Sequence, residues 1–571
     1  MIKNNTQSVI TKCNELRDFW APRNAKMKVW YRLIQLVDEL KTEKMESFVG
    51  NDPRSMFNLV LHMLDVEVPH RLRNIEDADL EVQTASAEVS KLFDTAWADL
   101  EDNFRRTGPR QSLKRSLIGL LLATGWYSAW AAIGDKGDRA YIDLWNPAQT
   151  FPMWDGDLGL SEVAHIYPVN PSRAKRMQVN NGWKDLGAMH GDQVVNDLWW
   201  VEVDTAWPYS TRVWNAVVLA GKLVKFEPTR FKRIPVYVAP IGGLPDTGPL
   251  SEGTEFGSSG RAGSQTKGDR WKEEIGQSII ATNESIYRAW NKWWTFSLQL
   301  LRDTAQPRIF ERSRSGKAIV KPEDVFRRGA IFRGGADDAV EFIGAPPIPL
   351  ELRSTQLDLE AMMQRGGVSW AMHGSVTGQL TAYVMSQIAA SANQVMRPYH
   401  QAIQNFFADI DNDWLEDIRE RGVRPYGWKL PENLPDDAKV TADFEVEIPG
   451  DLVQRATVAR MLDPEFALSY SFTLNKLFPE IKNPLQERAR RLADMAELSR
   501  ENSVIAQIRY YKKQAAFLSK TDADAARLYE LAAEAAEAQL IPQGSPPQGR
   551  GAIGTRTEGL PRFNIPEAPV L

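Results

Sequence analysis

Hydrophobic residues in the first 110 positions recur at three- and four-residue spacing, in segments such as 26–48, 52–64 and 86–108. This is the period of amphipathic helices that bury one face. Asp52 and Pro53 open the second segment with a capping residue and a proline at the first helical position. We therefore predict that this part of the chain is mostly helical.

From about Gly125 to Gly242 the pattern changes to that of strands. The segment 117–134 is apolar, but it is shorter than the ~20 residues that a membrane-spanning helix needs. We interpret it as a buried helix ending near Thr124, followed by a strand. Two apolar runs then flank a Gly/Asp turn, which predicts a β-hairpin over 126–145. A Gly/Ser/Pro-rich break follows at 242–269, either a linker or a mobile loop.

The next segment predicts a stalk. An uninterrupted helical pattern runs from about Asp269 to Asp303, with Gly276 as its one weak position. The insert 304–347 contains four short strand-like runs, and a second helical pattern then runs up to Gly366. A small module between two helices, the first ending where the second begins, predicts a stalk with a knob at its tip. The four strand-like runs are 308–313, 316–321, 330–335 and 339–344.

A further long helix is predicted from about Gln379 to Arg421. Pro398 lies in its interior, where a proline removes one hydrogen bond and favours a kink. We predict a return strand at 443–452, which would join the earlier sheet, and further helices over 453–540. The last thirty or so residues are too rich in Pro and Gly to form a core, so we expect a neighbouring chain to hold them.

Composition and charge narrow the function. A chain of 571 residues is too long to fold around a single hydrophobic core. Its net charge of −5 argues against binding nucleic acid over a large surface. Cys13 is the only cysteine, which excludes an intrachain disulfide or a cysteine-based zinc site and fits a reducing cytoplasm. No secretory signal is visible.

The sequence lacks the common motifs of catalytic sites. The chain has no HExxH, nucleotide-binding loop, GxSxG or CxxC, and its six histidines are scattered. Asp409, Asp411, Asp413 and Glu416 lie in a helical pattern without the glycine of a calcium loop, so we interpret them as a solvated acidic face. This favours a structural or assembly role over an enzyme, with no cofactor and no metal.

The order of elements resembles the portal proteins of tailed bacteriophages. The run "YIDLWNPAQTFPMWDGDLGLSEVAHIYPV" resembles the sheet of the portal wing, and helix, insert and helix resemble stem, clip and stem. "GGVSWAMHGSVTG" and the helix after it are similar to the tunnel loop and the kinked helix. The fold implied is α+β, predominantly α-helical. The implied divisions are a wing (1–268), first stem helix (269–303), clip (304–347), second stem helix (348–366), tunnel loop (367–378), kinked wing helix with return strand (379–452), helical crown (453–540) and tail (541–571).

The resemblance implies a ring of twelve subunits at one capsid vertex, through which double-stranded DNA passes without sequence specificity. Its implied partners are a terminase motor, a head–tail adaptor, and the major capsid and scaffolding proteins, with no membrane. Its location would be the virion, and the host cytoplasm during assembly. Twelve chains would carry about −60, which suits a conduit that does not grip phosphates. The alternatives are another ring-forming tail or connector protein and, less favoured, a nucleic-acid-processing enzyme such as terminase.

Four groups of residues are candidates for function within this scheme. Large flat indoles suit contacts between subunits, although they could instead pack on the subunit's own second stem helix. The clip arginines suit docking of a motor or adaptor, or are a solvated face. Trp370 could close around DNA, or could anchor its loop in the wing. The candidates are Trp290, Trp293 and Trp294 (interface); Arg308, Arg312, Arg314, Lys317, Arg327, Arg328 and Arg333 (clip docking); Gly366, Gly367, Trp370, Met372 and His373 (tunnel loop); and Pro398 (kink).

Overall fold

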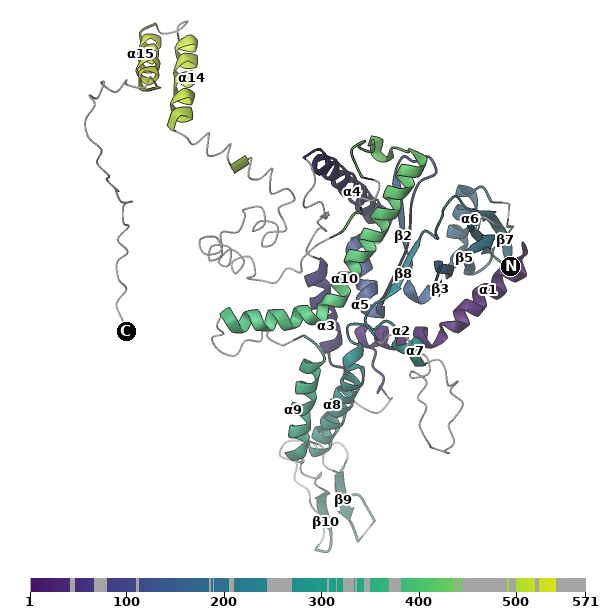
Figure 1. Cartoon of the computed structure of the whole chain (residues 1–571). Coiled ribbons are helices and arrows are strands. Elements are labelled where there is room, and N and C mark those ends of the chain that lie inside the picture. Colours follow the sequence, from purple (N-terminus) through teal and green to yellow (C-terminus); the bar gives the residue numbers. More distant parts are fainter. Residues whose placement is uncertain are drawn as a thin grey trace, which may run out of the picture. The chain divides into compact units, whose positions relative to one another are not determined.

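The chain has an α+β fold in which helices predominate, and it divides into two compact units, Met1–Met461 and Leu462–Leu571. Figure 1 shows the computed structural model. It describes residues 2–41, 47–65, 80–108, 112–183, 186–187, 189–204, 210–243, 270–305, 308–314, 316–321, 333, 336–343, 350–368, 382–435, 439–442, 490–491, 500–518 and 523–540.

Five helices form the N-terminal part of the first unit, as the hydrophobic spacing predicts. They are α1 (Thr6–Phe19), α2 (Ala21–Ile34), α3 (Asp52–Asp65), α4 (Leu80–Thr107) and α5 (Leu113–Thr124). The prediction of one helix through 26–48 is wrong for the described residues 35–41 and 47–48. Leu36 takes a left-handed φ of 59°, and the Val37 amide donates to the Arg32 carbonyl, which closes the helix as a C-terminal cap does.

Two antiparallel sheets follow, and the predicted hairpin is confirmed within the first. That sheet has the order β2-β1-β8, with Ala129 opposite Leu144 across the hairpin. The second has the order β3-β4-β5-β6-β7, and a short helix, α6 (Pro171–Asn180), joins β4 to β5. The strands are β1 (Trp126–Ile133), β2 (Ala140–Leu144), β3 (Thr150–Asp155), β4 (Gly159–Val169), β5 (Gln193–Asp204), β6 (Ser210–Leu219), β7 (Lys222–Pro228) and β8 (Val236–Pro240).

A buried arginine joins the helices to the start of the second sheet. Arg23 on α2 is only 2% exposed, and its Nη2 donates to the carbonyls of Pro147 (3.1 Å) and Thr150 (2.8 Å). Its guanidinium lies 4.8 Å from the Trp20 ring centroid and 4.7 Å from that of Trp126. Burial lowers the pKa of Arg23 to about 9. The turn at 147–150 is therefore held by aromatic faces and carbonyls around one cation.

The long helix α10 (Ala382–Arg421) contains Pro398, and Figure 1 shows it changing direction part-way along. Its acidic residues are not all solvated, which corrects the interpretation of a solvated face. Asp411 is fully buried and accepts a 2.8 Å hydrogen bond from Trp97 Nε1. Asp413 accepts one of 2.8 Å from the Tyr237 hydroxyl. A helix packed on both the helical part and the sheet uses its acidic positions to satisfy buried donors.

The second unit contains a helical hairpin of α14 (Arg500–Leu518) and α15 (Ala523–Leu540). The prediction of helix in 453–540 is confirmed for these two segments. The predicted return strand at 443–452 and the tail 541–571 lie outside the described residues.

Candidate functional site

The candidate site is the stalk, which we define as α8 (Glu284–Ala305), α9 (Leu350–Arg365) and the strands between them, β9 (Arg308–Arg312) and β10 (Ala339–Ile343). The other described parts of the first unit are called the body. The two helices pack against each other, and Figure 1 shows them leading away from the body to the paired strands at the tip. The predicted order of helix, insert and helix is confirmed.

The prediction of one continuous helix from 269 to 303 is wrong. A short helix, α7 (Arg270–Glu274), ends before Gly276, which has a φ of +77° and lies so close to Trp126 that an added Cβ would overlap the indole. The amides of Gln277 and Ile279 then donate to the carbonyls of Ile241 (2.8 Å) and Leu122 (3.0 Å). This segment gives its hydrogen bonds to the body, so the stalk helix begins only at Glu284.

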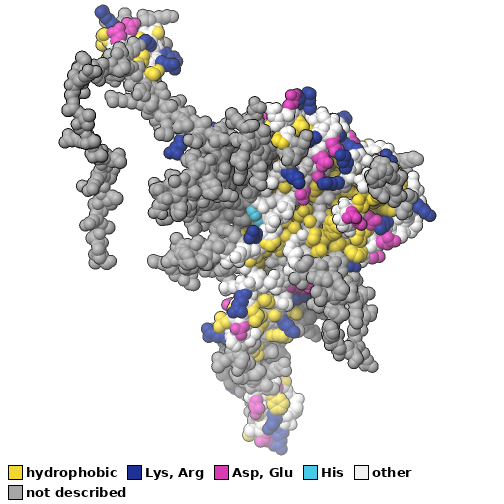
Figure 2. Space-filling model, viewed as in Figure 1, with side chains coloured by type: hydrophobic (Ala, Val, Ile, Leu, Met, Phe, Trp, Pro, Cys, Tyr) yellow, Lys and Arg dark blue, Asp and Glu magenta, His cyan; other side chains and the backbone are white. Residues whose placement is uncertain are grey.

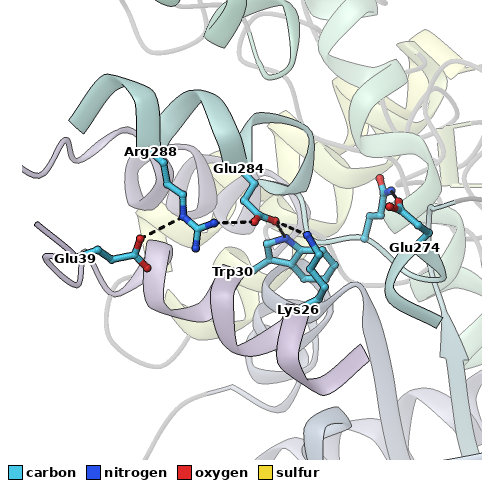
Figure 3. A network of polar contacts seen from close by, with 7 residues as sticks. Lys26, Trp30, Glu39, Glu274, Glu284 and Arg288 are labelled. Carbon is cyan, nitrogen blue, oxygen red and sulfur yellow. Dashed lines mark hydrogen bonds and ion pairs between the residues drawn. The ribbon is translucent and has the colours of Figure 1, made fainter. Parts of the chain in front are cut away.

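A polar network fixes the first turn of α8 to α2, as Figure 3 shows. The Glu284 carboxylate accepts hydrogen bonds from Trp30 Nε1 (2.9 Å), Lys26 Nζ (3.4 Å) and Arg288 Nη1 (3.2 Å). Arg288 Nε in turn donates to Glu39 at 3.2 Å. A carboxylate at a helix N-terminus is also favoured by the helix dipole. Side chains from two distant parts of the sequence thereby set where the stalk starts.

Two of the tunnel-loop candidates, Gly366 and Gly367, pack closely against neighbouring side chains. Asn283 Nδ2 donates to the Met363 carbonyl at 2.9 Å, and Gly366 lies so near that an added Cβ would overlap Asn283 Oδ1. At Gly367 a Cβ would lie 3.1 Å from Met56 Sδ. Neither glycine has a positive φ. Close packing rather than an unusual backbone angle therefore distinguishes these two positions. The other three tunnel-loop candidates, Trp370, Met372 and His373, lie outside the described residues.

The three indoles cluster at the attached half of α8. Trp290 is 8% exposed and stacks on Trp293 with ring centroids 6.1 Å apart, and Trp294 approaches Phe48 at 5.4 Å. The backbone of Phe48 and Gly50 donates to Thr295 Oγ1 (3.0 Å) and Asn291 Oδ1 (2.8 Å). The chain's own segment 48–50 covers Trp290, and contact of the three indoles with a neighbouring subunit stays a prediction.

Other apolar side chains on the stalk face solvent instead. Phe296 (54% exposed) and Leu301 (48%) lie on α8, and Leu357 (58%) and Met362 (48%) lie on α9. Figure 2 shows hydrophobic side chains interspersed with charged ones along the stalk. Leu357 and Met362 are five positions apart, about 140° around a helix, so they lie on different flanks of α9. Sequence reasoning singled out none of these residues as exposed, because the apolar period of a helix does not show which of its positions a neighbouring segment covers.

Acidic residues at the tip of the stalk offset much of the positive charge of the clip candidates. Of the clip candidates, Arg312, Arg314, Lys317 and Arg333 are exposed, Arg308 begins β9, and Arg327 and Arg328 lie outside the described residues. Arg314 pairs with Asp337 at 2.6 Å, and its amide donates to Asp338 at 3.0 Å. The insert 304–347 contains eight basic and six acidic residues, Asp337, Asp338 and Glu341 among them, so its net charge is only +2.

Two of the four predicted strands at the tip, β9 and β10, are confirmed and pair antiparallel. The prediction of a strand over 316–321 is wrong. The amides of Ile319 and Val320 donate to the Glu311 carboxylate at 3.0 and 3.1 Å, so a side chain takes the place of a partner strand. The prediction for 330–335 falls almost entirely outside the described residues.

The body has a cavity of about 510 Å³ on the five-stranded sheet, lined by aromatic and titratable residues. His165 stacks between Trp145 (4.1 Å) and Tyr167 (4.3 Å), and Asp197 lies opposite it on the next strand. Burial lowers the pKa of His165 to about 3 and raises that of Asp197 to about 6, although Asn215 Nδ2 donates to Asp197 at 2.7 Å. Because burial shifts the pKa values of these groups, we expect the stability of the body to depend on pH.

In the part of the chain that the structure describes, no three His, Cys, Asp or Glu side chains gather as a metal site would require. Among the described helices, none combines the length and apolar character needed to cross a membrane.

Comparison with known proteins finds neither a matching family model nor a matching curated protein. Three solved structures are similar. "Neck of empty GTA particle computed with C6 symmetry" has a TM-score of 0.40 at 12% identity, over 75% of this chain and 90% of that one. "Neck of native GTA particle computed with C12 symmetry" has 0.35 at 11%, over 73% and 98%. "Virion of native gene transfer agent (GTA) particle" has 0.35 at 13%, over 74% and 98%. At such low TM-scores the similarity assigns neither family nor function to this chain.

Proposed function

We propose that this chain is a portal protein, whose subunits form a ring-shaped DNA channel at one capsid vertex for genome packaging, ejection and attachment of the tail. The observation that carries the proposal is the stalk, an antiparallel helix pair with a small strand module at its tip and apolar side chains exposed on its flanks. A chain that binds one partner needs one apolar flank. A chain with a neighbour on each side, as in a ring, needs two.

The attachment of the stalk supports the same function. Glu284, Asn283 and Gly366 fix both helices to the body where the stalk begins. A ring whose stalks pack side by side requires every subunit to present its stalk at the same angle. The net charge of −5 per chain suits passage of DNA, because few phosphates are neutralised and the channel wall does not grip them.

The experiment is imaging of the purified full-length protein by negative-stain microscopy, with mass photometry to count subunits. Rings with a central hole and a count near twelve subunits are expected. A variant carrying Phe296→Ser, Leu357→Ser and Met362→Ser should form few rings or none. Val179→Ser is the matched control, because Val179 is 70% exposed on α6, away from the stalk. A wild-type protein that stays monomeric would contradict the proposal.

The second candidate function, another ring-forming tail or connector protein, shares these contacts between subunits. Coexpression with the capsid and scaffolding proteins of the same genome separates the two. A portal enters procapsids at one vertex, whereas a tail or connector ring stays outside them. Labelled protein found only outside procapsids would favour the connector.

Docking of the terminase motor or adaptor at the tip is a further part of the proposal. Arg312→Glu combined with Arg327→Glu and Arg328→Glu should leave rings intact and weaken partner binding, most strongly at low salt. Lys175→Glu with Arg176→Glu, both exposed on α6, is the control for charge alone. Equal binding by the tip variant and wild type would assign the tip no docking role.

The tunnel loop and the kink complete the proposal. Val368 is buried in the body core, so a loop deletion should begin at residue 369. Removal of 369–375 should give rings and procapsids that retain packaged DNA poorly. Pro398→Ala should stiffen α10 and impair packaging. Normal DNA retention by the deletion, or normal packaging with an unchanged helix path by Pro398→Ala, would remove the corresponding role.

A further inference from the structure

The α14–α15 hairpin buries small apolar residues between its helices. Ile508 and Ala515 on α14, and Ala533 and Ala536 on α15, are each less than 10% exposed. Tyr511 and Tyr529 approach each other with ring centroids 6.1 Å apart. Because the helices are antiparallel neighbours, this contact places residue 511 and residue 529 at the same level of the hairpin.

Large apolar side chains remain on the outer sides of the same helices. Tyr510 is 55% exposed, Leu528 68% and Leu531 55%. At 100° per residue, Tyr510 lies about 160° from Ile508, and Leu531 lies about 160° from Ala533. The outer apolar positions are therefore turned away from the partner helix within the hairpin, so that each hairpin presents one apolar side on α14 and another on α15.

The two helices also carry opposite charges. The segment Arg500–Leu518 has a net charge of +3, and Ala523–Leu540 has −3. Arg509 and Lys513 are exposed on α14, and Glu530 and Glu534 are exposed on α15. Contact of α14 with α14, or of α15 with α15, sets like charges against each other. Contact of α14 with α15 of another copy sets opposite charges together.

We propose that α14 of one copy packs against α15 of the next, so that the hairpins associate head to tail between copies of this chain. Such a heterologous contact closes into a ring when the rotation closes, and in this respect the inference rests on the proposed function. Copies side by side at equal height place Tyr510 level with Leu531 of the neighbour, as Tyr511 and Tyr529 are level within one hairpin.

The test is disulfide cross-linking of the full-length protein. Cys13 is the only cysteine and is fully buried, and burial raises the pKa of its thiol to about 12, so it is a poor nucleophile. In a Cys13→Ala background, Tyr510→Cys and Leu531→Cys are introduced together and oxidised with diamide. The two positions point away from each other within one hairpin, so a disulfide between them must join two copies.

The double variant should give a ladder of covalent oligomers on a non-reducing gel, and each single variant should stay monomeric. A single variant that gives abundant dimers would mean that like helices meet, which overturns the inference. Arg509→Glu with Lys513→Glu, added to the cysteine pair, should reduce the ladder several-fold. Addition of Glu530→Lys with Glu534→Lys should restore it. Lys175→Glu with Arg176→Glu on α6 is the control, and circular dichroism checks that helix content is retained.

The two proposals fail differently. Rings by microscopy without a ladder would overturn the hairpin contact and leave the proposed function standing. A ladder that Arg509→Glu with Lys513→Glu leaves unchanged would overturn the assignment of specificity to the opposite charges. Failure of the wild-type protein to form rings would count against the proposed function itself.

Discussion

The two halves of α8 contain similar residues in different surroundings. In the attached half, up to Thr295, the chain's own segment 48–50 and α2 cover the helix, and Trp290 is buried. In the free half, Phe296 and Leu301 are about half exposed. The body thus covers α8 at one end, whereas at the other end α8 packs against α9 and leaves Phe296 and Leu301 about half exposed. Changes in the attached half should cost stability, and changes in the free half should cost assembly.

The largest loss of stability is expected from Gly366→Ala. The new Cβ overlaps Asn283 Oδ1, and the Asn283 side chain cannot move without losing its hydrogen bond to Met363. We expect the free energy of unfolding to fall by about 3 kcal/mol. Gly156→Ala is the control, because nothing lies within 4 Å of an added Cβ there, and it should change stability by less than about 0.5 kcal/mol. Denaturant unfolding measures both, and equal values would show that the base of the stalk is loosely packed.

Glu284→Gln should have the next largest effect, about 2 kcal/mol, because Lys26 and Arg288 lose the carboxylate between them. Glu432→Gln is matched in chemistry, since Glu432 pairs with Lys429 at an exposed site, and should cause no measurable loss of stability. Chemical denaturation of the two variants sharpens the comparison. If the two variants lose equally little free energy of unfolding, the network around Glu284 contributes no more than a surface ion pair.

Buried titratable groups should make the body sensitive to acid. The folded state lowers the pKa of His165 from 6.5 to about 3, so the unfolded chain binds the proton first and stability falls as pH drops below about 6.5. Between pH 7.5 and 5.5, wild type should lose about 1.5 kcal/mol more than His165→Phe. Thermal and denaturant unfolding at both pH values test this, and identical losses would exclude His165 as the cause.

Asp197 should act in the opposite direction. Its raised pKa means that the folded state keeps the proton longer, so its contribution is full in acid and is lost as pH rises through about 6. Asp197→Asn should therefore be more stable than wild type at pH 8 and gain little at pH 4. A gain that is the same at both pH values would point to packing rather than ionisation.

The smallest change in stability is expected from Phe296→Ser with Leu357→Ser, below about 0.5 kcal/mol, since both side chains are already more than half exposed. The same variant should lose most of its ring population by mass photometry. A large loss of stability would show that the free half of the stalk belongs to the fold of the single chain, and the comparison between the halves would fail.

Local features of the sequence determined much of this protein. The spacing of apolar residues predicted the N-terminal helices, the β1–β2 hairpin and the order helix, insert, helix of the stalk. These depend on neighbours a few positions apart, whose period and turn residues are visible in the chain itself. The end of α5 was also predictable, because Gly125 takes the positive φ that closes the helix.

Tertiary structure decided what those patterns leave open. The helical period continues through Gly276, yet the backbone there bonds to Ile241 and Leu122, and only the assembled body supplies these partners. Trp290 and Leu357 are both apolar positions on stalk helices, but one is buried and the other exposed. Burial depends on which distant segment lies alongside, here residues 48–50. An amphipathic pattern shows that a helix has a face to cover, and only the three-dimensional arrangement shows whether its own chain covers it.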